Sequence, residues 1–236
     1  MTATPFDSPV WRGVLHDPDL APLFTDTAVL RAELLVMGTL ALTQAKTGAV
    51  PEVSAKAIQR AAMEVQIDPA ALSGLVAKTG DPVAALVAQF QAEMKAPEHA
   101  NWVHQQSDTR LTAATGLSLR LRQCLKILSG RLGGAETPPV FAYHPDPEIA
   151  AGLAEGLNLG DTAGAHPDDA VLAIATWLND TALALQARGV FDAALQHQMT
   201  HLHTSLHTAA PATRGMIIPM TLPQMVLGLG RLLRQD

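Results

Sequence analysis

The chain has 236 residues, of which 48% are hydrophobic and only 4% aromatic, and its formal net charge at pH 7 is −6. This charge excludes the basic surface by which proteins attract nucleic acid. A single cysteine, Cys124, excludes an internal disulfide and favours a reducing compartment. The first residues lack the basic and apolar regions of a signal peptide. We therefore expect a cytoplasmic protein.

The N-terminal part of the chain contains clear helix start and stop signals. A short helical turn is expected over 17–24, and a helix over 26–47 that is apolar nearly all round and must be covered on several sides. Its apolar run, 28–42, contains Arg31 and Glu33 and is expected to be too short to span a bilayer, so we expect no membrane partner. An Asp-Pro pair can cap and begin a helix, and a following glycine can end it. Such signals predict shorter helices over 52–65, 69–80 and 82–95, with a loop over 97–105.

A long helix is predicted from Gln106 to Gly133. Apolar and small residues recur there at steps of three and four, from Leu111 to Leu132, and Ser107 or Asp108 could cap its start. Cys124 lies on the apolar side of this helix, which favours a buried, inert thiol over a nucleophile.

The C-terminal part is also predicted to be helical. We expect helices over 147–157, 168–188 and 191–208, and then a tail with a kinked entry at Pro219 and Pro223 followed by a helix over 222–234. No run alternates like a strand, so the fold class is all-α. We expect two domains, a small N-terminal helical domain (1–105) and a shortened helical-bundle domain (106–236).

The segment 36–51 resembles a known family. Ala41, Gln44, Gly48 and Pro51 fill the pattern of the N-terminal helix and turn of the fumarase/aspartase superfamily, nearest to its 3-carboxy-cis,cis-muconate cycloisomerase and adenylosuccinate lyase branch. Residues 78–83, KTGDPV, are similar to the "TGNPV" that begins the family's next helix. The resemblance extends over about residues 20 to 130.

The resemblance implies an L-aspartase-like bundle of long helices and a role in aromatic catabolism. Family members are homotetramers that assemble each active site from three subunits. They abstract a proton beside a carboxylate and stabilise the enediolate, or add a carboxylate across a double bond, without a metal or organic cofactor. We therefore expect a small carboxylated ligand, no cofactor, no metal and a homo-oligomer, either a dimer or a tetramer.

The family's first catalytic patch, "HWGATSQD", precedes its long helix. Its counterpart here is the segment 101–109, where Ser107 falls on the family's serine and His104 lies near its histidine; Trp102 is the alternative, depending on a gap. The resemblance makes Ser107 and His104 the candidate catalytic residues. It makes Asn101, Thr109 and Arg110 the candidate substrate-binding residues, although a solvated basic face is the alternative interpretation for Arg110.

The other two catalytic patches depart from the family. The second, "T-H-G-Q-x-A", has no counterpart, as if a helical hairpin were deleted. The third is the mobile loop "GSSxMPxKxNP", which supplies a serine base and a lysine. Its counterpart is the segment 214–223, where Gly215 and Met216 replace the serines and Thr221 replaces the lysine. Because glycine, methionine and threonine supply neither base nor positive charge, we expect lost or altered catalysis. The alternative is a non-catalytic protein, a pseudoenzyme that binds a ligand or another subunit.

Four histidines, His197, His201, His203 and His207, lie in the predicted helix 191–208 as two pairs spaced by four residues. Such pairs can bind zinc or copper, but the stretch lacks a third ligand. A polar helix face, or a substitute acid–base role for one histidine, is the alternative.

Overall fold

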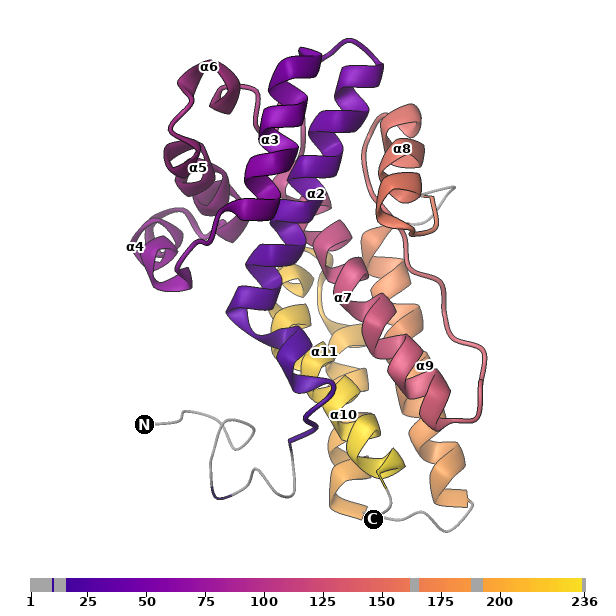
Figure 1. Cartoon of the computed structure of the whole chain (residues 1–236). Helices are drawn as coiled ribbons and strands as arrows, with labels where there is room; N and C mark the ends of the chain where they lie inside the picture. Colours follow the sequence, from indigo (N-terminus) through magenta and orange to yellow (C-terminus); the bar gives the residue numbers. More distant parts are fainter. Residues whose placement is uncertain (1–9, 11–15, 162–165, 188–192, 235–236) are drawn as a thin grey trace. The chain divides into compact units, whose positions relative to one another are not determined.

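The computed structural model describes residues 10, 16–161, 166–187 and 193–234. Within these residues the protein is helical and contains no strand, only an isolated parallel bridge between Phe141 and Gly160 (Figure 1). The all-α prediction is therefore confirmed. The helices are η2 (Ala21–Phe24), α2 (Asp26–Lys46), α3 (Glu52–Glu64), α4 (Pro69–Thr79), α5 (Pro82–Met94), α6 (Pro97–Ala100), α7 (Thr109–Arg131), α8 (Pro147–Leu157), α9 (Pro167–Ala187), α10 (Ala193–Thr208) and α11 (Pro211–Leu233).

The chain forms two compact units, each made of separate segments. Unit 1 contains residues 1–24, 122–139 and 168–236, and unit 2 contains residues 25–121 and 140–167. Helix α7 begins in unit 2 and ends in unit 1. The domain boundary expected after residue 105 remains a prediction.

Local capping explains where several helices begin. The side chains of Asp68, Asp81 and Asp146 each accept a hydrogen bond from a backbone N–H in the first turn of α4, α5 and α8, and a proline follows each aspartate. Gly80 ends α4 in the left-handed conformation (φ 69°), which glycine adopts without strain. The Asp-Pro punctuation therefore has the predicted role.

Helix α2 is the centre of unit 2, because two separate hydrophobic clusters share it. Leu34 and Met37 pack in a cluster with residues of α3, α4 and α5, whereas Val36 and Leu40 pack in a second cluster with residues of α8 and with Leu119 of α7. This arrangement confirms that the apolar helix is covered on several sides.

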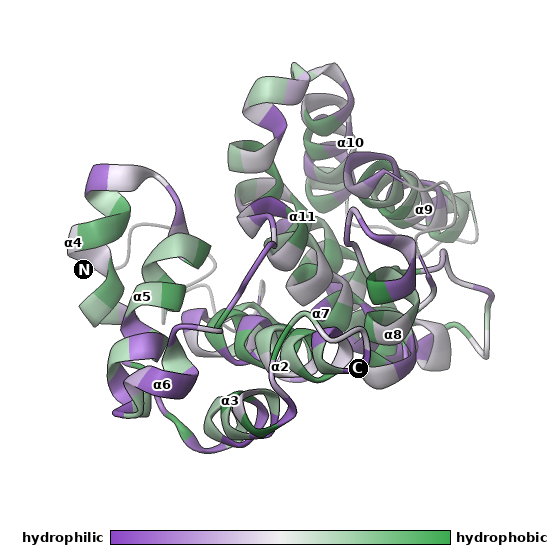
Figure 2. Ribbon diagram, turned by 90° about the horizontal axis from the view of Figure 1, so that it is seen from above, coloured by the Kyte–Doolittle hydropathy of each residue, from purple (hydrophilic) through white to green (hydrophobic). Residues whose placement is uncertain are grey.

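Helix α3 needs covering on one side only, because its buried residues Ala55, Ile58 and Ala62 recur at steps of three and four along one face. Figure 2 shows that α3 carries both hydrophobic and hydrophilic residues.

Close packing of α8 on α2 depends on glycine. A Cβ atom at Gly156 would lie 2.6 Å from the Cγ2 atom of Thr39, and one at Gly152 would overlap Thr43. The two helices therefore meet through small residues on α8 and threonine side chains on α2.

A buried ion pair joins three segments of unit 1. The guanidinium of Arg131, at the end of α7, donates to Asp17 Oδ2 at 2.5 Å, to Asp19 Oδ2 at 2.7 Å and to the carbonyl oxygen of Gly230 at 3.2 Å. The Asp17 side chain is fully buried. Removing Arg131 would leave that carboxylate buried without its cation, which is costly.

Two predicted elements differ in the structure. Helix α7 begins at Thr109 rather than Gln106. Gln106 has a left-handed backbone (φ 51°), and a helix cannot continue through that conformation. Asp108 caps the start of α7, because its side chain accepts a hydrogen bond from the N–H of Arg110 at 2.8 Å. The expected start of the last helix at residue 222 is wrong. Helix α11 is one helix with Pro219 and Pro223 inside it, and the burial of its C-terminal half offsets the hydrogen bonds that the prolines cannot donate.

By length and composition alone, α2, α9 and α11 could each cross a membrane. The expectation that the first of these is too short is therefore wrong, because α2 has 21 residues. Within the protein, 61% of the apolar window of α2 is buried. The absence of a membrane partner remains a prediction.

Glycine substitutions at two helical positions should have opposite effects. A Cβ atom at Gly230 would overlap Leu20 and lie 2.8 Å from Asp17 Oδ2, so Gly230→Ala should lower the free energy of unfolding by about 1–3 kcal/mol. Gly130 is exposed on α7 with no atom near the added methyl group, so Gly130→Ala should raise that free energy by about 0.5–1 kcal/mol. Urea denaturation of both variants measures the difference. Equal effects of the two substitutions would contradict the packing described for Gly230.

Candidate functional site

The predicted patch 101–109 lies in unit 2, between α6 and the start of α7. Gln44 of α2 holds it in place, because the Gln44 side-chain amide donates to the carbonyl oxygen of Gln105 at 2.6 Å. His104 has a left-handed backbone (φ 60°), so the segment turns sharply before α7 begins. Asn101 is exposed and Ser107 is half-buried.

His104 points toward α7. Its Nε2 atom lies 2.8 Å from the Oγ1 atom of Thr112, a buried hydroxyl. Burial lowers the pKa of His104; Asp81 and Asp108 oppose this effect and His144 adds to it. Burial therefore favours the neutral imidazole of His104, a form that can accept a proton or a hydrogen bond.

Thr109 is already engaged within the protein. Its hydroxyl donates to Asp81 Oδ2 at 2.8 Å, while Asp81 Oδ1 accepts from the N–H of Ala84 at 3.0 Å. The carboxylate that caps α5 therefore also fixes the first residue of α7.

Arg110 faces solvent. Its side chain is 87% exposed and forms an ion pair with Asp108 at 2.9 Å. This pair holds the pKa of Asp108 below its usual range. Among the five predicted site residues, the structure places His104 and Thr109 near Asp81, and it leaves Asn101 and Arg110 at the surface. Their functional roles remain predictions.

A buried acid at this site was not predicted from the sequence. Glu33 of α2 is only 4% exposed, and no hydrogen-bond partner for its Oε2 atom is found among the described residues. Burial raises the pKa of Glu33 to about 7; the Arg120 guanidinium opposes the shift and Asp81 adds to it. A Cβ atom at Gly116 of α7 would lie 3.1 Å from Glu33 Cγ, so the glycine makes room for this side chain. A glutamate inside an apolar run was the signal that could have identified it.

His144 was also missed. Its Nδ1 atom accepts from the N–H of Asp146 at 3.0 Å, and burial lowers its pKa. We call Glu33, Asp81, His104, Arg120 and His144 the polar cluster of unit 2. These groups shift one another's pKa values. Such coupling is found at sites of acid–base catalysis and also in structural ion networks.

The counterpart of the family's mobile loop is helical. Residues 214–223 all lie within α11, in unit 1. Arg214 forms an ion pair with Asp168 at 2.9 Å, and the Thr221 hydroxyl donates to the carbonyl oxygen of Ile217, one turn earlier. The segment is therefore held by the hydrogen bonds of a helix rather than exposed as a loop.

The predicted histidine helix is α10. Burial and the neighbouring His207 lower the pKa of His203, and Asp180 of α9 opposes the shift. Within the described residues, no group of three or more His, Cys, Asp or Glu side chains is placed to hold a metal ion.

Known proteins with similar sequence or structure agree with the resemblance found in the sequence. No model of a protein family matches the chain. A 3-carboxy-cis,cis-muconate cycloisomerase of Pseudomonas putida is 29% identical over 118 residues, which cover 49% of this chain and 28% of that protein. The crystal structure of 3-carboxy-cis,cis-muconate lactonizing enzyme from Pseudomonas putida matches 96% of this chain and 75% of that one, with a TM-score of 0.82 and 17% identity.

Two further crystal structures extend this result. The β-carboxy-cis,cis-muconate cycloisomerase of Acinetobacter calcoaceticus matches 94% of this chain and 75% of that one, with a TM-score of 0.79 and 17% identity. A fumarate lyase of Mesorhizobium matches 92% of this chain and 73% of that one, with a TM-score of 0.69 and 15% identity. The chain has the fold of the fumarase/aspartase superfamily.

The buried carboxyl of Glu33 should make stability depend on pH. Its pKa is about 7 in the folded protein, above its ordinary value of 4.5, so its stabilising contribution is complete below pH 4.5 and is lost as the pH rises through 7. Glu33→Gln, which mimics the neutral acid, should therefore raise the free energy of unfolding above pH 7 by roughly 2–3 kcal/mol and have little effect near pH 4.5. Denaturant titrations across this pH range measure the effect.

Glu136→Gln, at an exposed glutamate, is the matched control and should leave the pH dependence unchanged. If Glu33→Gln destabilised the protein equally at all pH values, the interpretation of Glu33 as a neutral buried acid would be wrong.

Proposed function

We propose that this chain is a 3-carboxy-cis,cis-muconate cycloisomerase-like protein that has lost the family's proton-abstracting chemistry on a carboxylated substrate. The observation that carries the proposal is the helical state of residues 214–223. The family loop must supply a base and a cation from a mobile segment. Here the corresponding positions are Gly215, Met216 and Thr221, and all three lie in α11.

The electrostatics of the polar cluster support the same proposal. A substrate carboxylate and its enediolate need positive charge in a site that excludes water. Asp81 and Glu33 instead contribute carboxyl groups, against the single guanidinium of Arg120. Arg110 does not change this balance, because Asp108 neutralises it at the surface. Without another source of positive charge, an anionic ligand is poorly matched to this cluster.

Enzyme assays test the proposal directly. The purified protein should give no detectable turnover of 3-carboxy-cis,cis-muconate, followed by loss of the diene absorbance, because removing even one such catalytic group typically costs about 10²–10³-fold in rate. Ser107→Ala tests the half-buried family serine, and Ser129→Ala, in unit 1, is the matched control. Turnover that disappears in Ser107→Ala but persists in Ser129→Ala would overturn the proposal.

The alternative function is a non-catalytic protein that binds a ligand or another subunit, and exposed methionines favour it. Met216 and Met220 lie one turn apart on α11 and are 74% and 66% exposed. Such side chains adapt readily to a partner. The apolar surface of α2 is largely buried within unit 2 and needs no partner.

We therefore propose a homo-oligomer that uses Met216 and Met220. Light scattering after size exclusion should give a mass above that of the monomer. Met216→Glu together with Met220→Glu should shift it toward the monomer, because charges are poorly tolerated in an apolar interface. Met63→Glu, at another exposed methionine, on α3, is the control. A monomer at all concentrations, or an equal shift in the control, would contradict the proposal.

We also propose a cytoplasmic location. The sequence contains one cysteine, Cys124, and it is buried, as expected for an inert thiol that a reducing compartment maintains.

A further inference from the structure

Two histidines of α10 direct ring nitrogens at one atom of α9. The Nε2 atoms of His203 and His207 lie 3.4 Å and 3.3 Å from the Oγ1 atom of Thr176. The ring centroids are 4.1 Å apart, with 42° between the ring planes. Both Nε2 atoms therefore border the same small space in unit 1.

A hydrogen bond fixes the tautomer of one ring. The Nδ1 atom of His207 lies 3.1 Å from the carbonyl oxygen of His203, and because a carbonyl only accepts, Nδ1 carries the hydrogen. In the neutral ring, Nε2 then carries a lone pair toward Thr176. A backbone carbonyl that holds the other ring nitrogen is the usual support of a metal-binding histidine. The Thr176 hydroxyl has one hydrogen and can donate to only one of the two rings.

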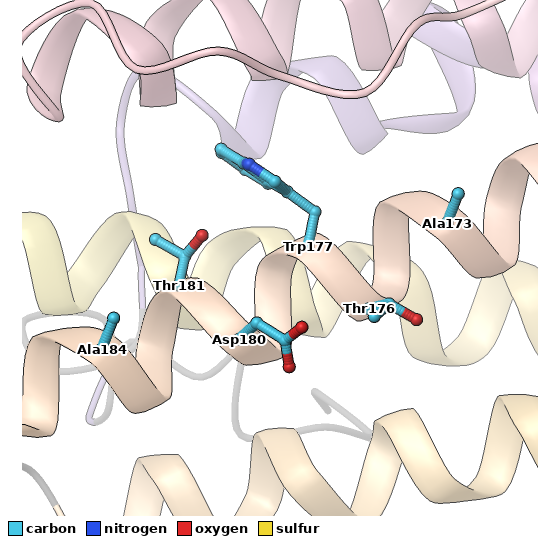
Figure 3. Close-up of a pocket in the computed structure, with 6 residues that line it drawn as sticks. All are labelled: Ala173, Thr176, Trp177, Asp180, Thr181 and Ala184. Atoms are coloured by element: carbon cyan, nitrogen blue, oxygen red, sulfur yellow. The ribbon is translucent and has the colours of Figure 1, made fainter.

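The space around these nitrogens is accessible and has an acid close by. Figure 3 shows the Asp180 carboxylate and the Thr176 hydroxyl on the same side of α9, and Asp180 is exposed and interacts electrostatically with His203. His207 is exposed, so its ring is open to solvent. A bound ion could therefore keep water molecules in its remaining coordination positions.

We propose that His203 and His207 bind a divalent first-row transition-metal ion through their Nε2 atoms, displacing the Thr176 hydroxyl from between the rings. Imidazole nitrogen suits copper, nickel and zinc, and the affinity order of these ions makes Cu²⁺ the strongest. The protein supplies two nitrogens, and water molecules supply the other ligands, while the nearby Asp180 carboxylate adds negative charge that favours a cation. This arrangement accords with the absence of a three-residue ligand set among the described residues.

Titration of the tag-free protein with Cu²⁺ tests the proposal. Calorimetry at neutral pH should show one strong site, and electron paramagnetic resonance should show two nitrogen ligands. His203→Ala and His207→Ala should each weaken binding by roughly tenfold or more, because each removes one of two protein ligands. Asp180→Asn should weaken it by a smaller factor. Circular dichroism checks that every variant is folded.

His197 and His201 are the matched control, because they too lie four residues apart on α10 and both are exposed. His197→Ala together with His201→Ala should leave the strong site unchanged. The proposal is overturned if Cu²⁺ does not bind, if binding survives in the double variant of His203 and His207, or if the control variant loses it equally.

Discussion

Burial of α2 on two sides constrains unit 2 more than any other feature. The helix contributes Leu34 and Met37 to one hydrophobic cluster and Val36 and Leu40 to another, so no face of it is left entirely to solvent. A polar side chain buried on this helix must therefore find its place inside the protein. Gln44 does so by donating a hydrogen bond to the turn before α7. Burial raises the pKa of Glu33 against the opposing effect of Arg120, and thereby favours the neutral acid.

The same constraint explains why the candidate site is rich in unusual charge states. Glu33 and His104 are both withdrawn from water, which disfavours the charged form of each. The Asp81 carboxylate accepts hydrogen bonds from the Thr109 hydroxyl and from the backbone of α5. The polar cluster therefore contains ionisable acid and imidazole side chains and little positive charge. An enzyme that stabilises an enediolate needs the reverse balance, so the buried charges and the helical segment 214–223 support the same conclusion about function.

Much of the fold could be predicted because its signals are local. An aspartate before a proline caps a helix with its own side chain, so Asp68, Asp81 and Asp146 marked the starts of α4, α5 and α8 correctly. The start of α11 was predicted wrongly, because proline usually interrupts a helix and the sequence contains Pro219 and Pro223. Tertiary burial of α11 overrode this local rule, and the helix continues through both prolines. The polar cluster could not be assembled from the sequence, because Glu33, Asp81 and His104 come from separate elements that only packing brings together. His104 was found through the family resemblance, whereas Glu33 had no counterpart in the quoted motifs.

The ion pair of Arg131 has a consequence for how the chain acquires its structure. Arg131 bonds to Asp17, which lies 114 positions earlier, and to Gly230, which lies 99 positions later. Contacts between such distant positions slow folding, because the loops between them must close before the contacts can form. During synthesis, Asp17 and Arg131 leave the ribosome well before α11 is made. Unit 1 can therefore complete its interior only after nearly the whole chain has been translated, whereas all of unit 2 lies within residues 25–167 and can fold earlier.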